Sequence, residues 1–92
     1  MPGKPRHGHM RKNSKTYRAW SAMLDRCRNP RNTKYSRYGG RGIVVEDRWF
    51  TFENFLEDMG IAPEGLLLDR IDNDKGYYKD NCRWATITES NR

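Results

Sequence analysis

The feature that most constrains the fold is a dense run of turn-forming residues near the C-terminal end, placed between two apolar segments. The run is Asp-Asn-Asp-Lys-Gly at positions 72–76, and these residue types favour tight turns. Residues 66–71 before it and 82–86 after it have the apolar and aromatic content of short strands. Residues 87–92 leave room for about one and a half helical turns. The segment 66–92 therefore predicts a strand, a turn, a second strand and a short helix.

Two amphipathic helices are expected before this segment. The first covers residues 15–28 and follows Ser14, whose side chain is suited to cap a helix N-terminus. The second covers residues 52–59 and ends at Gly60. Apolar residues recur in the first helix at spacings of three and four, as in a buried stripe: Tyr17, Trp20, Leu24 and Cys27.

The loop at residues 29–42 joins the first helix to a short strand expected at 43–46. It contains Gly39, Gly40 and Gly42 among tyrosines and basic residues. Glycines allow close approach to a phosphate backbone, and they also allow a tight turn. The sequence leaves both interpretations open.

The predicted fold class is α+β, in a single small domain at residues 14–92. Residues 1–13 combine Pro, Gly, His and basic residues with almost no apolar content, which predicts a flexible basic arm. The two histidines there, His7 and His9, are expected to be incidental. No apolar run predicts a membrane span and no secretory signal is expected, so the predicted location is the cytoplasm, that of the host cell if a phage encodes the chain. Cys27 and Cys82 are expected to be core residues.

Charge is unevenly distributed along the 92 residues. Residues 1–41 contain twelve basic residues and one acid, a net charge of +11. Residues 42–92 contain six basic and eleven acidic residues, a net charge of −5. A strongly basic half is typical of a surface that binds a polyanion, although part of the excess could also serve solubility.

Three oxygen-bearing side chains have a distinctive spacing in the C-terminal segment. Asn81 follows Asp69 by twelve residues and Asn91 follows it by twenty-two. This pattern resembles the HNH or His-Me finger of phage homing-type endonucleases, in which a β-hairpin and a helix hold one divalent metal. The resemblance implies that Asp69 and Asn91 ligate the metal and that Asn81 orients the catalytic base and braces the hairpin. Oxygen ligands of this kind suit Mg²⁺ or Mn²⁺.

Other segments extend the resemblance over roughly residues 17–91. They are similar to segments of small phage and prophage HNH-like proteins, and they read YRAWSAMLDRCRNP, YGGRGI, DRWFTFENFLEDMG, LDRIDN and NCRWAT.

Arg70 stands where the nuclease motif has its general-base histidine. An arginine side chain stays protonated at neutral pH and cannot accept a proton from water. It can bind a phosphate through two hydrogen bonds or stabilise negative charge in a transition state. Hydrolysis would then need another base, such as a metal-bound hydroxide, Asp72, or a histidine of the arm.

The same residues are also compatible with a purely structural role. Asp69, Asp72 and Asp74 could simply be hairpin and turn residues, with Arg70 paired to one of them. An EF-hand beginning at Asp72 fails, because Tyr77 stands where that loop needs glycine. A dinucleotide-binding loop at 39–42 fails because a strand, not a helix, is expected after it.

The sequence thus predicts a phage-type HNH-like protein that binds double-stranded DNA. It leaves open a metal-dependent endonuclease or nickase with Arg70 and Asn81 in the site, a catalytically inactive DNA-binding module, and a phage protein that inhibits a host defence enzyme. The residues expected to contact nucleic acid are Lys4, Arg6, Arg11, Lys12, Arg18, Arg37, Arg41 and Arg83.

Overall fold

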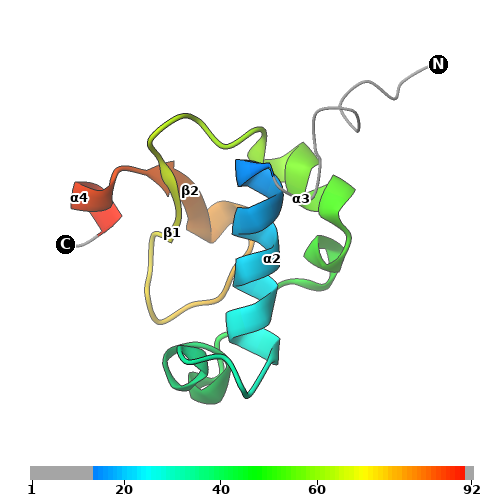
Figure 1. Cartoon of the computed structure of the whole chain (residues 1–92), viewed down its shortest axis with the longest axis vertical. Coiled ribbons are helices and arrows are strands. Elements are labelled where there is room, and N and C mark those ends of the chain that lie inside the picture. The colour runs from blue at the N-terminus through cyan, green and yellow to red at the C-terminus, as the bar shows by residue number, and fades with distance from the viewer. Residues whose placement is uncertain (1–13, 91–92) are drawn as a thin grey trace.

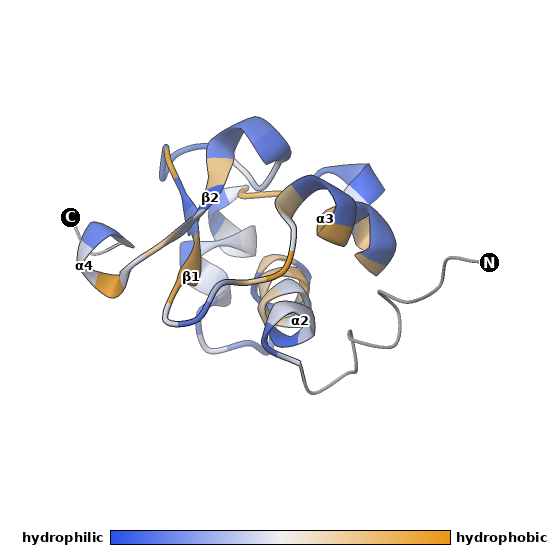
Figure 2. Cartoon of the chain, turned by 90° about the horizontal axis from the view of Figure 1, so that it is seen from above, coloured by the Kyte–Doolittle hydropathy of each residue, from blue (hydrophilic) through white to orange (hydrophobic). Residues whose placement is uncertain are grey.

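A computed structural model describes residues 14–90 of the chain and gives an α+β fold, as the sequence predicted. Four regular elements carry the architecture: helix α2 (Lys15–Arg28), helix α3 (Phe52–Met59) and strands β1 (Leu67–Arg70) and β2 (Cys82–Ala85). Figures 1 and 2 show α2 in the middle, with α3 on one side of it and the hairpin on the other. Among the described residues, no helix has the length and apolar character needed to cross a membrane.

Both long helices occupy the predicted ranges because their end signals act locally. The Ser14 hydroxyl accepts a hydrogen bond from the Tyr17 backbone N–H at 3.1 Å and caps α2. Gly60 ends α3 with φ of 71°, a left-handed backbone angle that glycine adopts without strain. The expected stripe on α2 does face the interior, where Met23 and Cys27 are buried and Tyr17, Trp20 and Leu24 pack against the core.

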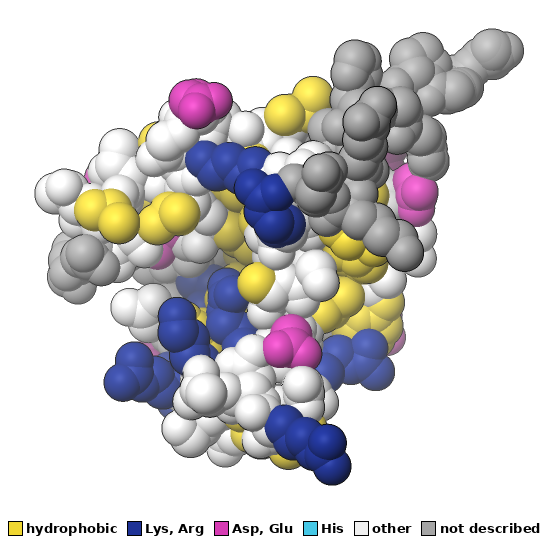
Figure 3. All heavy atoms as spheres, viewed as in Figure 1, with side chains coloured by type: hydrophobic (Ala, Val, Ile, Leu, Met, Phe, Trp, Pro, Cys, Tyr) yellow, Lys and Arg dark blue, Asp and Glu magenta, His cyan; other side chains and the backbone are white. Residues whose placement is uncertain are grey.

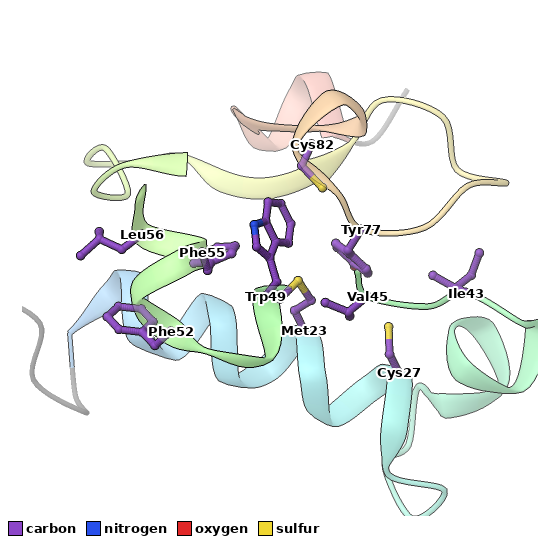
Figure 4. Packing of buried hydrophobic residues seen from close by; sticks show 10 residues of the cluster. All are labelled: Met23, Cys27, Ile43, Val45, Trp49, Phe52, Phe55, Leu56, Tyr77 and Cys82. Carbon is purple, nitrogen blue, oxygen red and sulfur yellow. The ribbon is translucent and has the colours of Figure 1, made fainter. Parts of the chain in front are cut away.

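The core lies where α2, α3 and the hairpin meet. Figure 4 shows Trp49 in the middle of the cluster, between Met23 of α2 and Cys82 of the hairpin. Trp49 belongs to a short 3-10 helix, η3 (Asp47–Phe50), which the sequence did not predict. Trp49, Met23 and Phe55 have no exposed surface, so any cavity made at these positions would be costly.

The strand expected at 43–46 is reduced to one parallel bridge between Val45 and Tyr77. The Tyr77 N–H donates to the Val44 carbonyl at 2.8 Å, and the Glu46 N–H donates to the Tyr77 carbonyl at 3.0 Å. The partner segment turns soon after Tyr77 into the 3-10 helix η4 (Lys79–Asn81). A longer ladder therefore has no second strand to pair with.

The glycines of loop 29–42 serve the turns of the loop. The loop contains two 3-10 helices, η1 (Tyr35–Arg37) and η2 (Gly39–Arg41). A side chain on Gly39 would collide with the backbone carbonyl of Cys27, so glycine lets this loop pack against the end of α2. Gly42 has a φ of 91° and ends η2. Both positions fit the tight-turn interpretation of the sequence.

Strands β1 and β2 pair antiparallel, with Leu67 opposite Ala85 and Arg70 opposite Cys82. A short helix, α4 (Ile87–Ser90), follows β2 directly. Its start is fixed by a reciprocal capping pair in which Thr86 N–H donates to the Glu89 carboxylate at 2.8 Å and Glu89 N–H donates to the Thr86 hydroxyl at 3.1 Å. The hairpin and helix thus occur in the order that the sequence predicted.

Candidate functional site

Asn81 holds the turn between the two strands. Its Oδ1 accepts a hydrogen bond from the Asp72 N–H at 2.9 Å. Its Nδ2 donates to the carbonyls of Asp72 at 3.1 Å and Gly76 at 2.8 Å. The side chain is buried, and these three bonds brace the turn in the way predicted for Asn81. Its expected role in orienting a catalytic base stays a prediction.

Arg70 holds the same turn from the other strand. One guanidinium nitrogen, Nη1, donates to the carbonyls of Asn73 at 2.7 Å and Lys75 at 2.8 Å. The Cζ carbon lies 5.1 Å from the ring centre of Tyr38 and 5.2 Å from that of Tyr77, within the range of a cation–π contact. Arg70 is only 7 % exposed. Arg70 therefore stabilises the turn and packs on two aromatic rings. It does not pair with a carboxylate of the turn.

Asp69 is also 7 % exposed, and both of its carboxylate oxygens have partners. Oδ2 accepts from Arg83 Nε at 3.0 Å, and Oδ1 accepts from the Ser90 hydroxyl at 3.0 Å. Arg83 lies opposite Asp69 in the strand register, so the two side chains share one face of the hairpin. Ser90 reaches this carboxylate from α4, where the capping pair at the helix start positions it.

Neighbouring residues of a strand point to opposite faces, and this separates Asp69 from Arg70. Asp69 faces Arg83 and α4, while Arg70 faces the Tyr38 ring of loop 29–42. The sequence placed both residues in one catalytic site. The structure directs the two side chains to different surroundings.

The donor set for the expected Mg²⁺ or Mn²⁺ is incomplete in residues 14–90. No group of three His, Cys, Asp or Glu side chains gathers there. Asp69 is the one predicted ligand in this range, and its oxygens already bind Arg83 and Ser90. Asn91, the other predicted ligand, lies outside the described residues. The described side chains therefore do not by themselves fit a divalent-cation site.

Basic residues of α2 and loop 29–42 form an exposed surface. Residues 14–41 contain eight basic residues and one acid, a net charge of +7. Arg28, Arg31, Lys34 and Arg37 are exposed, and within residues 14–90 none of them pairs with a carboxylate. The single acid, Asp25, accepts hydrogen bonds from the side chains of Asn29 and Asn32 instead.

An open cleft of about 370 Å³ lies beside this surface. Its lining comes from four separate parts of the chain: Ala19, Arg26, Lys34, Tyr38, Leu67, Leu68 and Ser90. Figure 3 shows dark blue side chains around a hollow in this face of the molecule. A smaller hollow of about 230 Å³ shares Ala19, Leu67 and Leu68 with the cleft and continues toward Arg18.

Arg26 is fixed at the cleft by its hydrogen bonds to Tyr77. Its Nε and Nη2 donate to the Tyr77 hydroxyl at 3.2 and 2.8 Å. Its Cζ lies 4.9 Å from the Tyr38 ring centre, and Arg70 lies on the same ring. The Arg26 and Arg70 guanidinium groups therefore lie close to each other, in contact with one aromatic ring. Burial raises the pKa of Tyr77, while the Arg26 charge opposes that shift, so the hydroxyl stays neutral and leaves both guanidinium charges in place.

The two cysteines are core residues, as predicted. Both are buried and neither forms a disulfide. Burial raises the pKa of Cys82 to about 12 and also raises that of Cys27. Since the thiolate is the reactive form, neither side chain is suited to nucleophilic chemistry at neutral pH.

The remaining predicted DNA contacts differ in their availability. Arg18 and Arg37 are exposed. Arg41 pairs with Asp74 of the hairpin turn at 3.1 Å, and Arg83 pairs with Asp69. Four further positions lie outside the described residues: Lys4, Arg6, Arg11 and Lys12.

None of the residues that line the cleft was among the predicted site residues, Lys34, Tyr38 and Ser90 included. Basic residues interleaved with tyrosines in loop 29–42 were a signal for the first two. Ser90 had no such signal, because its place depends on how α4 folds back on the hairpin. No protein-family model, curated protein or solved structure compared with this chain matches it.

Proposed function

We propose that the protein is a double-stranded-DNA-binding module that uses the basic surface of α2 and loop 29–42. The observation that carries this proposal is a set of exposed cations on that surface, none of which pairs with a carboxylate in residues 14–90: Arg28, Arg31, Lys34 and Arg37. Cations that are not already paired can replace the counterions of a phosphate backbone. The cell's cytoplasm is where the chain would meet its DNA partner.

Salt dependence tests the proposal directly. Each neutralised phosphate contributes a slope of about −0.9 to the plot of log affinity against log salt concentration. Four contacts predict a slope of about −3 to −4 for a fluorescein-labelled duplex titrated at salt concentrations from about 50 to about 200 mM. Arg37→Gln should reduce the slope by about one.

Lys79→Gln is the matched control. Lys79 is also exposed but belongs to η4 and not to α2 or loop 29–42. A salt-independent association, or equal losses for Arg37→Gln and Lys79→Gln, would contradict the assigned surface. If the protein binds no duplex, the result favours the other predicted function, inhibition of a host enzyme.

The second candidate is a metal-dependent nuclease on an HNH-like scaffold. The observation that favours it is the buried Asp69 carboxylate between a hairpin and the helix that follows it, with Ser90 of that helix as a partner. The contacts of Asp69 and Arg70 favour binding over cleavage. Incubation with supercoiled plasmid and Mg²⁺ or Mn²⁺ decides between them, because metal-dependent nicking that is lost in Asp69→Ala would establish the enzyme.

A further inference from the structure

The cleft has two chemically different parts, and a duplex backbone would use only one of them. Arg26 and Lys34 supply cationic groups, while Ala19, Leu67 and Leu68 supply an apolar floor. Leu67 is 42 % exposed, which leaves much of its side chain open to a ligand. Phosphates of a duplex would satisfy the cations and leave the floor without a partner, since paired bases are stacked inside the helix.

An unpaired nucleotide carries both matching groups. Its phosphate is an anion for Arg26 and Lys34, and its base has an exposed flat face that packs on apolar or aromatic side chains. The volume of about 370 Å³ falls in the range of small-molecule sites. Tyr38 at the same wall adds an aromatic ring whose orientation is held by contacts with Arg26 and Arg70.

The electrostatic field in the cleft also favours an anion. Arg26 and Arg70 lie on the same Tyr38 ring, and neither is paired with a carboxylate in residues 14–90. Asp69, the acid that binds the cleft residue Ser90, is paired with Arg83. An anion placed between Arg26 and Lys34 would therefore meet two positive charges, neither of which is paired with a carboxylate in residues 14–90.

We propose that this cleft is a binding site for an unpaired nucleotide of a DNA strand, with Arg26 and Lys34 on the phosphate and Leu67 under the base. The adjoining hollow along α2 would receive the neighbouring nucleotide. The proposal goes beyond duplex binding, because it assigns a strand with free bases to a site that duplex DNA fills only in part.

Two pairs of matched variants test the site with a fluorescein-labelled oligothymidylate. Leu67→Asn changes the floor, and Ile87→Asn makes the same kind of change at an exposed position that does not line the cleft. Lys34→Gln removes a cleft cation, and Arg31→Gln removes one on the same loop outside the cleft. Thermal unfolding followed by circular dichroism verifies that each variant is folded.

The expected result is a loss of roughly five- to tenfold in oligothymidylate affinity for Leu67→Asn and for Lys34→Gln. The controls Ile87→Asn and Arg31→Gln should each reduce oligothymidylate affinity by less than about half the fold-change of their matched variant. For the duplex, Leu67→Asn should leave the affinity unchanged, while Lys34→Gln and Arg31→Gln should weaken it equally.

The outcomes separate this proposal from the proposed function. The nucleotide site is overturned if the protein does not bind oligothymidylate. It is also overturned if Leu67→Asn and Ile87→Asn weaken that binding equally, even if duplex binding persists. Oligothymidylate binding with the expected variant pattern supports the site even if no duplex is bound, in which case the proposed duplex function fails alone.

Discussion

Replacing Arg70 with histidine restores the residue type that the nuclease motif has at this position, and the structure predicts that the main effect is on stability. The imidazole is shorter than the arginine side chain and cannot reach the carbonyls of Asn73 and Lys75, which now accept hydrogen bonds at 2.7 and 2.8 Å. It also loses the guanidinium contacts with Tyr38 and Tyr77. The turn would keep the bonds made by Asn81 and by Arg41, together with the short-range bonds from Asp74 and Lys75 to Asp72.

The size of the effect follows from these contacts. A hydrogen bond from a charged donor contributes about 1.5–3 kcal/mol, and a cation–π contact adds about 0.5–1 kcal/mol. Partial replacement by water reduces the total, so a net loss of about 2–4 kcal/mol in the free energy of unfolding is expected. For a domain of this size, each kcal/mol lowers Tm by about 4–8 °C. The expected decrease in Tm is therefore roughly 8–32 °C.

Thermal and urea unfolding followed by circular dichroism measure this effect. Arg31→His is the control, because Arg31 is exposed and its side chain makes no ion pair among residues 14–90. A Tm for Arg70→His within about 3 °C of the control would refute the assigned structural role. In the plasmid assay we expect no gain of nicking, since residue 70 faces away from Asp69; a folded variant that nicks DNA would show that the two positions cooperate after all.

Three further predictions concern pH, thiol reactivity and the last helix. The Arg48 guanidinium lowers the pKa of Asp58 below its ordinary 3.8, so the stabilisation from this pair is present above about pH 4 and is lost as pH falls through the folded-state pKa; acid unfolding should be less steep in Asp58→Asn. Cys82 and Cys27 should not react with a thiol reagent at pH 8 in the folded protein and should both react in urea, whereas fast reaction in buffer would contradict their burial. Thr86→Ala removes the capping hydroxyl of α4 and should cost about 1 kcal/mol, seen as faster amide exchange in residues 87–90 with little change elsewhere; unchanged exchange would show that the cap is not needed.

Local signals in the sequence were sufficient to locate the helices and the hairpin. Ser14 before the first helix and Gly60 after the second are end signals that act within one turn, and both predicted ranges match the structure. The turn run at 72–76 likewise fixed the order of β1 and β2.

Features that depend on distant contacts were not predictable in the same way. A strand at 43–46 needs a partner of equal length, and the segment around Tyr77 offers one bridge only. The role of Arg70 depends on Tyr38, which lies 32 positions earlier in the chain. The cleft depends on α2, loop 29–42, β1 and α4 together, so no single segment of sequence contains it.

The three tryptophans have a consequence for how the protein would respond to damage. The Trp20 indole N–H donates to the Trp49 carbonyl at 2.7 Å, Trp49 donates to the Asp58 carboxylate at 2.7 Å, and Trp84 donates to the Met59 carbonyl at 2.8 Å. Each indole thus joins two segments, and together they connect α2, η3, α3 and β2 in one chain of contacts. Phenylalanine could fill much of the same space, but it has no N–H group and could make none of these three hydrogen bonds. Oxidation of one indole would therefore weaken the contact between two segments at once. Because the three indoles lie in connected segments, their fluorescence should change together in a single transition when the protein unfolds.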